Sequence, residues 1–272
     1  MAKQAAGRRR RVPVLERGDI VFFYRPRVVT AEVARREDVQ RFFLVLAPHG
    51  RALYRLFVIG RKGLPDVRPG EARPEERHWG VNALTTCEPE RLRDELAPRE
   101  YATATRGERW VGAAKPVGEG RYQLVTHLDH TELVYALELP KRLGPAPEEF
   151  GIRERASYIL AVKNPAIAMS EFPSAREPAR YPERALEKFG DRRWIPAEPE
   201  LLDYEGTEIL LIGAHGEGVE AELGLHIDKE AETEATAEVF RRLKVRKQRA
   251  ALAPLLGGQF PEREVGDSAR AS

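Results

Sequence analysis

The sequence predicts a β-rich α+β protein, with mostly antiparallel sheets or barrel-like units, a few short helices and a C-terminal helix. Its apolar residues fall mainly in short β-branched and aromatic runs that Gly and Pro separate, which is the pattern of strands and turns. Few segments repeat apolar residues every three or four positions, as an amphipathic helix would. At 272 residues with 42% hydrophobic side chains, the chain is long enough to bury a core.

Three strands are expected near the beginning of the chain. The first, residues 19–24, is β-branched and aromatic, and Pro26 follows it. The other two, residues 41–46 and 53–59, flank the loop 47–51, in which Pro and Gly favour a turn. Short loops between consecutive strands favour antiparallel pairing.

A long polar loop, residues 61–77, then leads to a short strand at 79–84. A helix is expected after that strand, because Thr85 and Glu88 have the spacing of a capping box. Pro89 suits the first turn of a helix, so the helix should begin there.

The middle of the chain returns to strands. Residues 121–127 and 132–139 alternate or run apolar, and the four residues 128–131 between them are typical of a hairpin loop. Residues 157–162 predict a further strand. A short helix is expected at 182–189, where glycine follows to end it.

A glycine-rich hairpin is expected between the strands 208–212 and 219–227. The three glycines between these strands have the order G-x-x-G-x-G and lack the Lys-Ser/Thr of a phosphate-binding loop. The chain then enters the predicted C-terminal helix, residues 229–253. Acidic residues come early in it and basic residues late, as the helix dipole favours.

These elements divide the chain into five parts. We expect a disordered basic arm at residues 1–17, a first β-rich unit at 18–100 and a second β-rich unit at 101–228. The C-terminal helix, 229–253, and a disordered tail, 254–272, complete the prediction.

The formal net charge of +2 conceals two strongly basic segments: residues 1–17 carry a net +5 and residues 241–249 a net +6. Clustered Lys and Arg side chains bind phosphates by displacing counterions, which indicates contact with RNA or DNA. The alternative is a solvated arm and a helix end whose cations complement the dipole. The candidate nucleic-acid-binding residues are Arg8, Arg9, Arg10, Arg11, Arg241, Arg242, Lys244, Arg246, Lys247 and Arg249.

The predicted hairpin also carries four residues that could bind a metal ion: His127, Asp129, His130 and Glu132. A tight hairpin would bring His127 and Glu132 together across its mouth and place the other two in the turn. Imidazole and carboxylate groups are ligands for transition metals. The spacing matches no established zinc motif, and Asp is also a common turn residue. A metal or acid–base site and an ordinary turn are therefore both open.

A non-enzymatic cytoplasmic binding protein that contacts RNA or DNA through its basic termini is the function these patterns favour. The alternatives are a metal-dependent hydrolase centred on the hairpin from His127 to Glu132, and an accessory factor that binds another protein. No apolar stretch approaches the roughly 18 residues that span a membrane, and the basic start lacks the apolar core of a secretory signal. The single cysteine, Cys87, excludes an intramolecular disulfide. The sequence identifies no cofactor and no protein partner.

Overall fold

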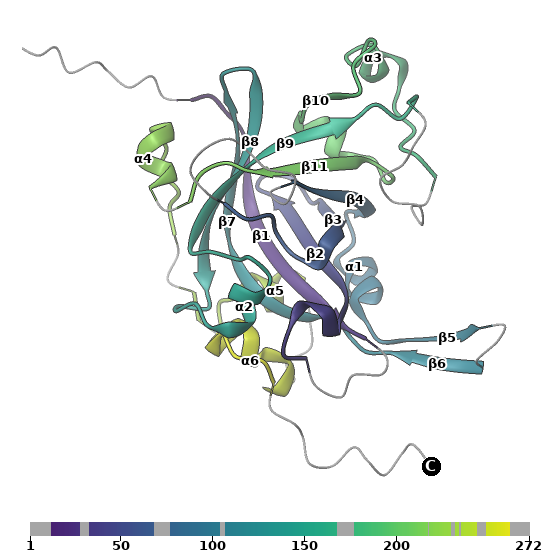
Figure 1. Cartoon of the computed structure of the whole chain (residues 1–272), viewed down its shortest axis with the longest axis vertical. Coiled ribbons are helices and arrows are strands. Elements are labelled where there is room, and N and C mark those ends of the chain that lie inside the picture. The colour runs from purple at the N-terminus through teal and green to yellow at the C-terminus, as the bar shows by residue number, and fades with distance from the viewer. Residues whose placement is uncertain are drawn as a thin grey trace, which may run out of the picture.

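The structure is a computed structural model that describes residues 12–27, 33–67, 77–103, 107–167, 177–216, 218–229, 232–233, 235–243 and 249–261. Eight of its strands belong to a barrel: β1 (Val14–Pro26), β2 (Val39–Pro48), β3 (Tyr54–Ile59), β4 (Arg77–Thr86), β7 (Lys115–His127), β8 (His130–Leu139), β9 (Arg155–Lys163) and β11 (Glu208–Gly213). They follow one another around the barrel as β8, β9, β11, β4, β3, β2, β1 and β7, and β7 pairs with β8 to close it (Figure 1). Every ladder is antiparallel. This confirms the predicted β-rich, barrel-like α+β fold.

Smaller elements surround the barrel. β10 (Trp194–Pro196) pairs with β9, and a separate ribbon of β5 (Arg99–Thr103) and β6 (Gly107–Val111) extends away from the barrel (Figure 1). The α-helices are α1 (Pro89–Leu96), α2 (Pro145–Glu149), α3 (Glu183–Leu186), α4 (Val219–Leu223), α5 (Glu238–Arg241) and α6 (Arg249–Gly257). In the part of the chain that the structure describes, the 3₁₀ helices are η1 (Arg36–Asp38), η2 (Gly60–Lys62) and η4 (Pro199–Asp203). No helix among the described residues has the length and apolar character needed to cross a membrane.

The barrel joins the two stretches that the sequence divided into separate β-rich units, residues 18–100 and 101–228. β1 lies between β2 and β7, and β11 lies between β4 and β9. Hydrogen-bonded ladders therefore connect the two stretches on both sides, and the boundary at residue 100 does not separate two sheets. Local sequence patterns show where strands are, but strand order depends on contacts between distant residues.

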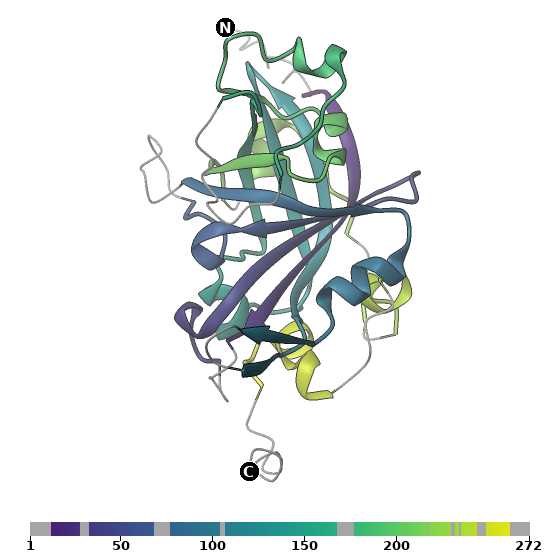
Figure 2. The same ribbon diagram turned by 90° about the vertical axis from the view of Figure 1, so that its right-hand side faces the viewer.

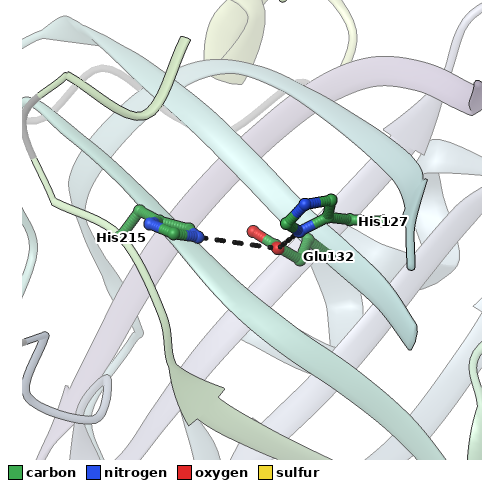
Figure 3. A group of neighbouring side chains, drawn as sticks. All are labelled: His127, Glu132 and His215. Carbon is green, nitrogen blue, oxygen red and sulfur yellow. Dashed lines mark hydrogen bonds and ion pairs between the residues drawn. The ribbon is translucent and has the colours of Figure 1, made fainter. Parts of the chain in front are cut away.

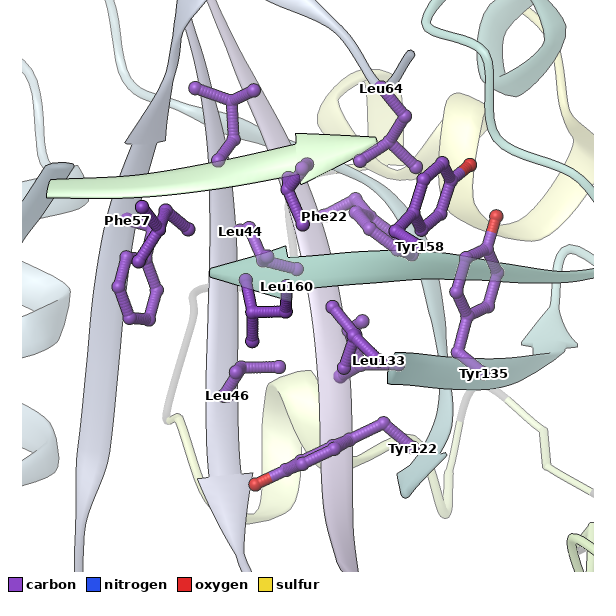
Figure 4. Close-up of a cluster of buried hydrophobic side chains, with 14 of the residues drawn as sticks. Phe22, Leu44, Leu46, Phe57, Leu64, Tyr122, Leu133, Tyr135, Tyr158 and Leu160 are labelled. Carbon is purple, nitrogen blue, oxygen red and sulfur yellow. The ribbon is translucent and has the colours of Figure 1, made fainter. Parts of the chain in front are cut away.

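Both faces of β1 are buried from residue 18 to residue 25. On β1, Ile20, Phe22 and Tyr24 point into the interior, where Figure 4 shows Phe22 packed among aromatic and aliphatic side chains. Val21 and Phe23 point outward and join a second apolar cluster with residues of α1, α5 and α6. These helices lie against the outside of the strands (Figure 2). Successive side chains of β1 point to opposite faces of the sheet, and both sets are apolar because both faces are buried.

The predicted helix at 229–253 is not continuous. Residues 232, 233 and 235–237 are not helical, α5 has only four residues, and α6 begins at Arg249. Thr233 and Thr236 favour the interruption: the Thr233 N–H donates to Thr236 Oγ1 (2.9 Å) and the Ala235 N–H to Thr233 Oγ1 (3.3 Å). Such side-chain bonds compete with the helical backbone pattern. α6 also extends into the predicted disordered tail, and β1 into the predicted basic arm.

The predicted strand at 219–227 is absent: residues 219–223 form α4, and residues 225–227 belong to neither a helix nor a strand. Val219, Leu223 and Ile227 are buried and pack on the outer face of β7 and β8. Their spacing of four residues fits a helical face as well as it fits the alternation of a strand. Gly224, with φ of 64°, ends α4 in the left-handed region that favours glycine.

The helix predicted after Thr85 is present as α1, but its capping box is not. Thr85 belongs to β4, and Glu88 occupies the N-cap position without a side-chain cap. The Glu88 N–H donates instead to Thr86 Oγ1 (3.0 Å). The start of α1 therefore depends on Pro89 in its first turn.

Candidate metal centre

The β7–β8 hairpin is tighter than the sequence predicts. His127 pairs directly with His130, so the turn has two residues, Leu128 and Asp129, rather than four. Two-residue hairpin turns require a residue with positive φ, and Leu128 supplies it with φ of 53°. Leu128 is 83% exposed. This turn places His127 and His130 opposite each other at the end of the hairpin.

Three of the four predicted metal-binding residues come together at the end of this hairpin. Glu132 on β8 is fully buried. Its Oε1 lies 2.8 Å from His127 Nδ1 and 3.1 Å from His130 Nε2. Asp129 does not reach Glu132; its Oδ1 lies 3.3 Å from His130 Nδ1, and its side chain is 97% exposed.

A further histidine, His215, reaches the same carboxylate from the segment that follows β11 (Figure 3). The Ser157 N–H on β9 donates to the His215 carbonyl (2.7 Å), and the His215 N–H donates to Ser157 Oγ (3.1 Å). These bonds hold His215 Nε2 at 3.8 Å from Glu132 Oε1. Sequence reasoning missed His215, because nothing near it in the chain indicates that its neighbour is the β7–β8 hairpin.

His127, Glu132 and His215 form a set of ligands suited to a transition metal. Each offers one ligand atom, and the three atoms lie within 4.8 Å of one another. Glu132 Oε2 is buried and has no hydrogen-bond partner among the described residues. A buried acceptor without a partner is unfavourable, and coordination of the carboxylate by a cation would compensate for it. Two imidazoles and a carboxylate are donors that bind zinc and related divalent ions.

The surroundings of Glu132 favour its ionised form. Burial raises the pKa of Glu132. The Ser157 hydroxyl, the hydrogen bonds from His127 and His130, and the charge of His215 together lower the pKa by more than burial raises it. The pKa of Glu132 therefore lies below its ordinary value. The ionised carboxylate is the form that binds a metal ion.

The structure describes only two side chains of the predicted nucleic-acid surface, and both face carboxylates of the same chain. Arg241 Nη2 lies 2.9 Å from Glu238 Oε1, and Arg242 contacts Asp19 and Glu238. Arg249 begins α6, but its side chain is not described. The remaining candidates lie outside the described residues: Arg8, Arg9, Arg10, Arg11, Lys244, Arg246 and Lys247.

Comparisons of the chain with protein-family models, curated proteins and solved structures found no match. Function is therefore inferred from the side chains and their geometry.

Proposed function

We propose that this protein binds one divalent transition-metal ion through His127, Glu132 and His215. The supporting observation is that ligand atoms from β7, β8 and the segment after β11 lie within 4.8 Å of one another. Metal–ligand bonds of about 2.0–2.2 Å place tetrahedral ligands roughly 3.5 Å apart. Small side-chain movements would therefore close the three ligands around one ion.

The donor types restrict the class of metal. Two imidazoles and one carboxylate suit Zn²⁺, Fe²⁺, Co²⁺ or Ni²⁺, whereas Ca²⁺ and Mg²⁺ prefer oxygen ligands alone. Because Glu132 is fully buried beside the two histidines, a bound cation would also offset the desolvation of its carboxylate.

Metal stoichiometry and affinity of the full chain test this proposal. We expect one equivalent of Zn²⁺ in isothermal titration calorimetry, confirmed by elemental analysis after dialysis. Glu132→Gln keeps the side-chain size but removes the anionic ligand, and it should weaken binding by more than about 100-fold, beyond the loss typical of outer-shell changes. His226→Asn is the matched control, because the His226 side chain is 79% exposed and its ring pairs with the exposed Asp228. Equal affinity in wild type and Glu132→Gln, or no binding by wild type, would contradict the proposal.

The hydrolase hypothesis depends on a coordination position that water can occupy. Three protein ligands leave such a position in a tetrahedral site, so this hypothesis requires that no fourth side chain fills it. Binding of RNA or DNA through the basic termini stays a prediction of the sequence. Retention on heparin that falls steeply with salt would test it.

A further inference from the structure

We propose that His130 is the fourth protein ligand and that Asp129 orients it, which closes the metal site. The bound ion then clamps the β7–β8 hairpin to the segment that leads from β11 into α4. This inference rests on the proposed function, because it assigns the coordination and the role of the same ion.

Three imidazoles direct a nitrogen at one carboxylate oxygen. His127 Nδ1, His130 Nε2 and His215 Nε2 lie 2.8, 3.1 and 3.8 Å from Glu132 Oε1. One oxygen has two lone pairs, so it accepts at most two such hydrogen bonds with good geometry. A cation between the rings and the carboxylate would bind a lone pair from each of the four groups. The convergence is therefore better suited to coordination than to hydrogen bonding alone.

Asp129 contacts the His130 ring as a second-sphere carboxylate contacts a metal-binding histidine. Metal-binding histidines usually donate the other ring N–H to a carboxylate, which fixes the tautomer and the ring orientation. The 3.3 Å contact from Asp129 Oδ1 to His130 Nδ1 leaves Nε2 directed at Glu132. His130 is not in the group of ligand atoms within 4.8 Å, so its ring must move closer to the other ligands when the ion binds. The His130 side chain is 23% exposed, so protein atoms do not enclose the ring completely.

The ion would attach α4 and the residues after it, which lie on the outside of the barrel, to the β7–β8 hairpin. His215 lies four residues before Val219, the first residue of α4. Val219 and Leu223 of α4 and the following Ile227 cover Val125 of β7 together with Val134 and Ala136 of β8. Figure 1 shows α4 outside the barrel beside these strands. A helix of five residues is too short to be stable alone, so its place on the barrel depends on such attachments.

Comparing the Co²⁺ spectra of wild type and His130→Ala distinguishes a site closed by His130 from one whose fourth ligand is water. With Co²⁺ in the full chain, we expect the intense visible absorption of a four-coordinate site. His130→Ala should change that spectrum and weaken binding of Zn²⁺ by at least about 10-fold. Asp129→Asn should keep the Co²⁺ spectrum and weaken binding of Zn²⁺ about 10- to 100-fold. Asp129→Glu should restore most of the affinity for Zn²⁺. Asp228→Asn, in the exposed His226–Asp228 pair (3.0 Å), is the matched control and should change neither.

Hydrogen exchange measures the clamp. Zn²⁺ should slow exchange in residues 214–227 at least about 10-fold in wild type and less in His130→Ala. An unchanged Co²⁺ spectrum and Zn²⁺ affinity in His130→Ala would overturn the fourth ligand and favour an open, water-binding site. Metal binding without protection of residues 214–227 would overturn the clamp. Both results leave metal binding itself intact, whereas an absence of binding by wild type refutes the proposed function.

Discussion

Replacing Glu119 by Gln should remove a large part of the pH dependence of stability between about pH 5 and 8. Glu119 on β7 is fully buried, and its two carboxylate oxygens accept the N–H groups of Glu238 (2.6 Å) and Val239 (2.9 Å) at the start of α5. Burial raises the pKa of Glu119 from 4.5 to about 8, against the lowering effect of these two hydrogen bonds. The nearby charges of Glu232 and Glu238 raise it further.

The direction of the effect follows from proton binding. Between pH 4.5 and about 8 the carboxyl is ionised in the unfolded chain and protonated in the folded protein. Unfolding therefore releases a proton, and the free energy of unfolding falls as pH rises through this interval. At about 1.36 kcal/mol per pKa unit, the loss approaches roughly 5 kcal/mol. Glutamine does not titrate, so Glu119→Gln should not show this loss.

Urea denaturation at half-unit intervals from pH 5 to 9 measures the difference. Glu119→Gln should be less stable than wild type at pH 5, by about 1–3 kcal/mol, because the amide accepts only one of the two N–H bonds. The two curves should then converge or cross as the pH rises. Glu183→Gln, at an exposed position on α3, should follow the wild-type curve. Parallel curves for wild type and Glu119→Gln would refute the reasoning.

Four other substitutions, one of them a control, test the packing of the barrel and the hairpin. Arg55→Met should lower the free energy of unfolding in urea by about 3–5 kcal/mol, because this fully buried arginine pairs with two carboxylates (2.6 Å to each). Arg51→Met, whose side chain is 47% exposed, should change it by less than about 1 kcal/mol, and equal losses would contradict the difference in burial. Phe22→Ala should lower it by about 3–5 kcal/mol and reduce Tm; an unchanged Tm is incompatible with the described core. Leu128→Gly should raise the free energy of unfolding by about 1 kcal/mol, because glycine adopts a φ of 53° without steric cost. A decrease in the free energy of unfolding would count against strain in the turn.

The fold class could be predicted because it depends on local patterns. The runs around Phe22, Leu44 and Leu133 are apolar over short lengths, and turn residues separate them. The hairpin of His127 and Glu132 could be predicted for the same reason, since its two strands are consecutive in the chain. The sequence does not show the length of the turn, because Leu128 is an unusual residue for a positive φ.

The missed features depend on distant contacts or on ambiguous spacing. His215 reaches Glu132 through backbone hydrogen bonds to Ser157 on another strand, and no spacing in the sequence indicates that pairing. The spacing of Val219, Leu223 and Ile227 fits both a strand and a helix. In the structure all three are buried against β7 and β8, and the chain is helical only over Val219–Leu223. Because alternate residues of β1 are apolar on both faces, the sequence does not indicate which of them face the barrel interior.

The position of β11 has a consequence for synthesis on the ribosome. This strand lies between β4 and β9, both of which precede it in the chain. A nascent polypeptide that has emerged only as far as residue 207 therefore presents two sheet edges with unpaired backbone groups. Such edges are templates for aggregation, so a chain halted at this point needs a chaperone more than the finished protein does.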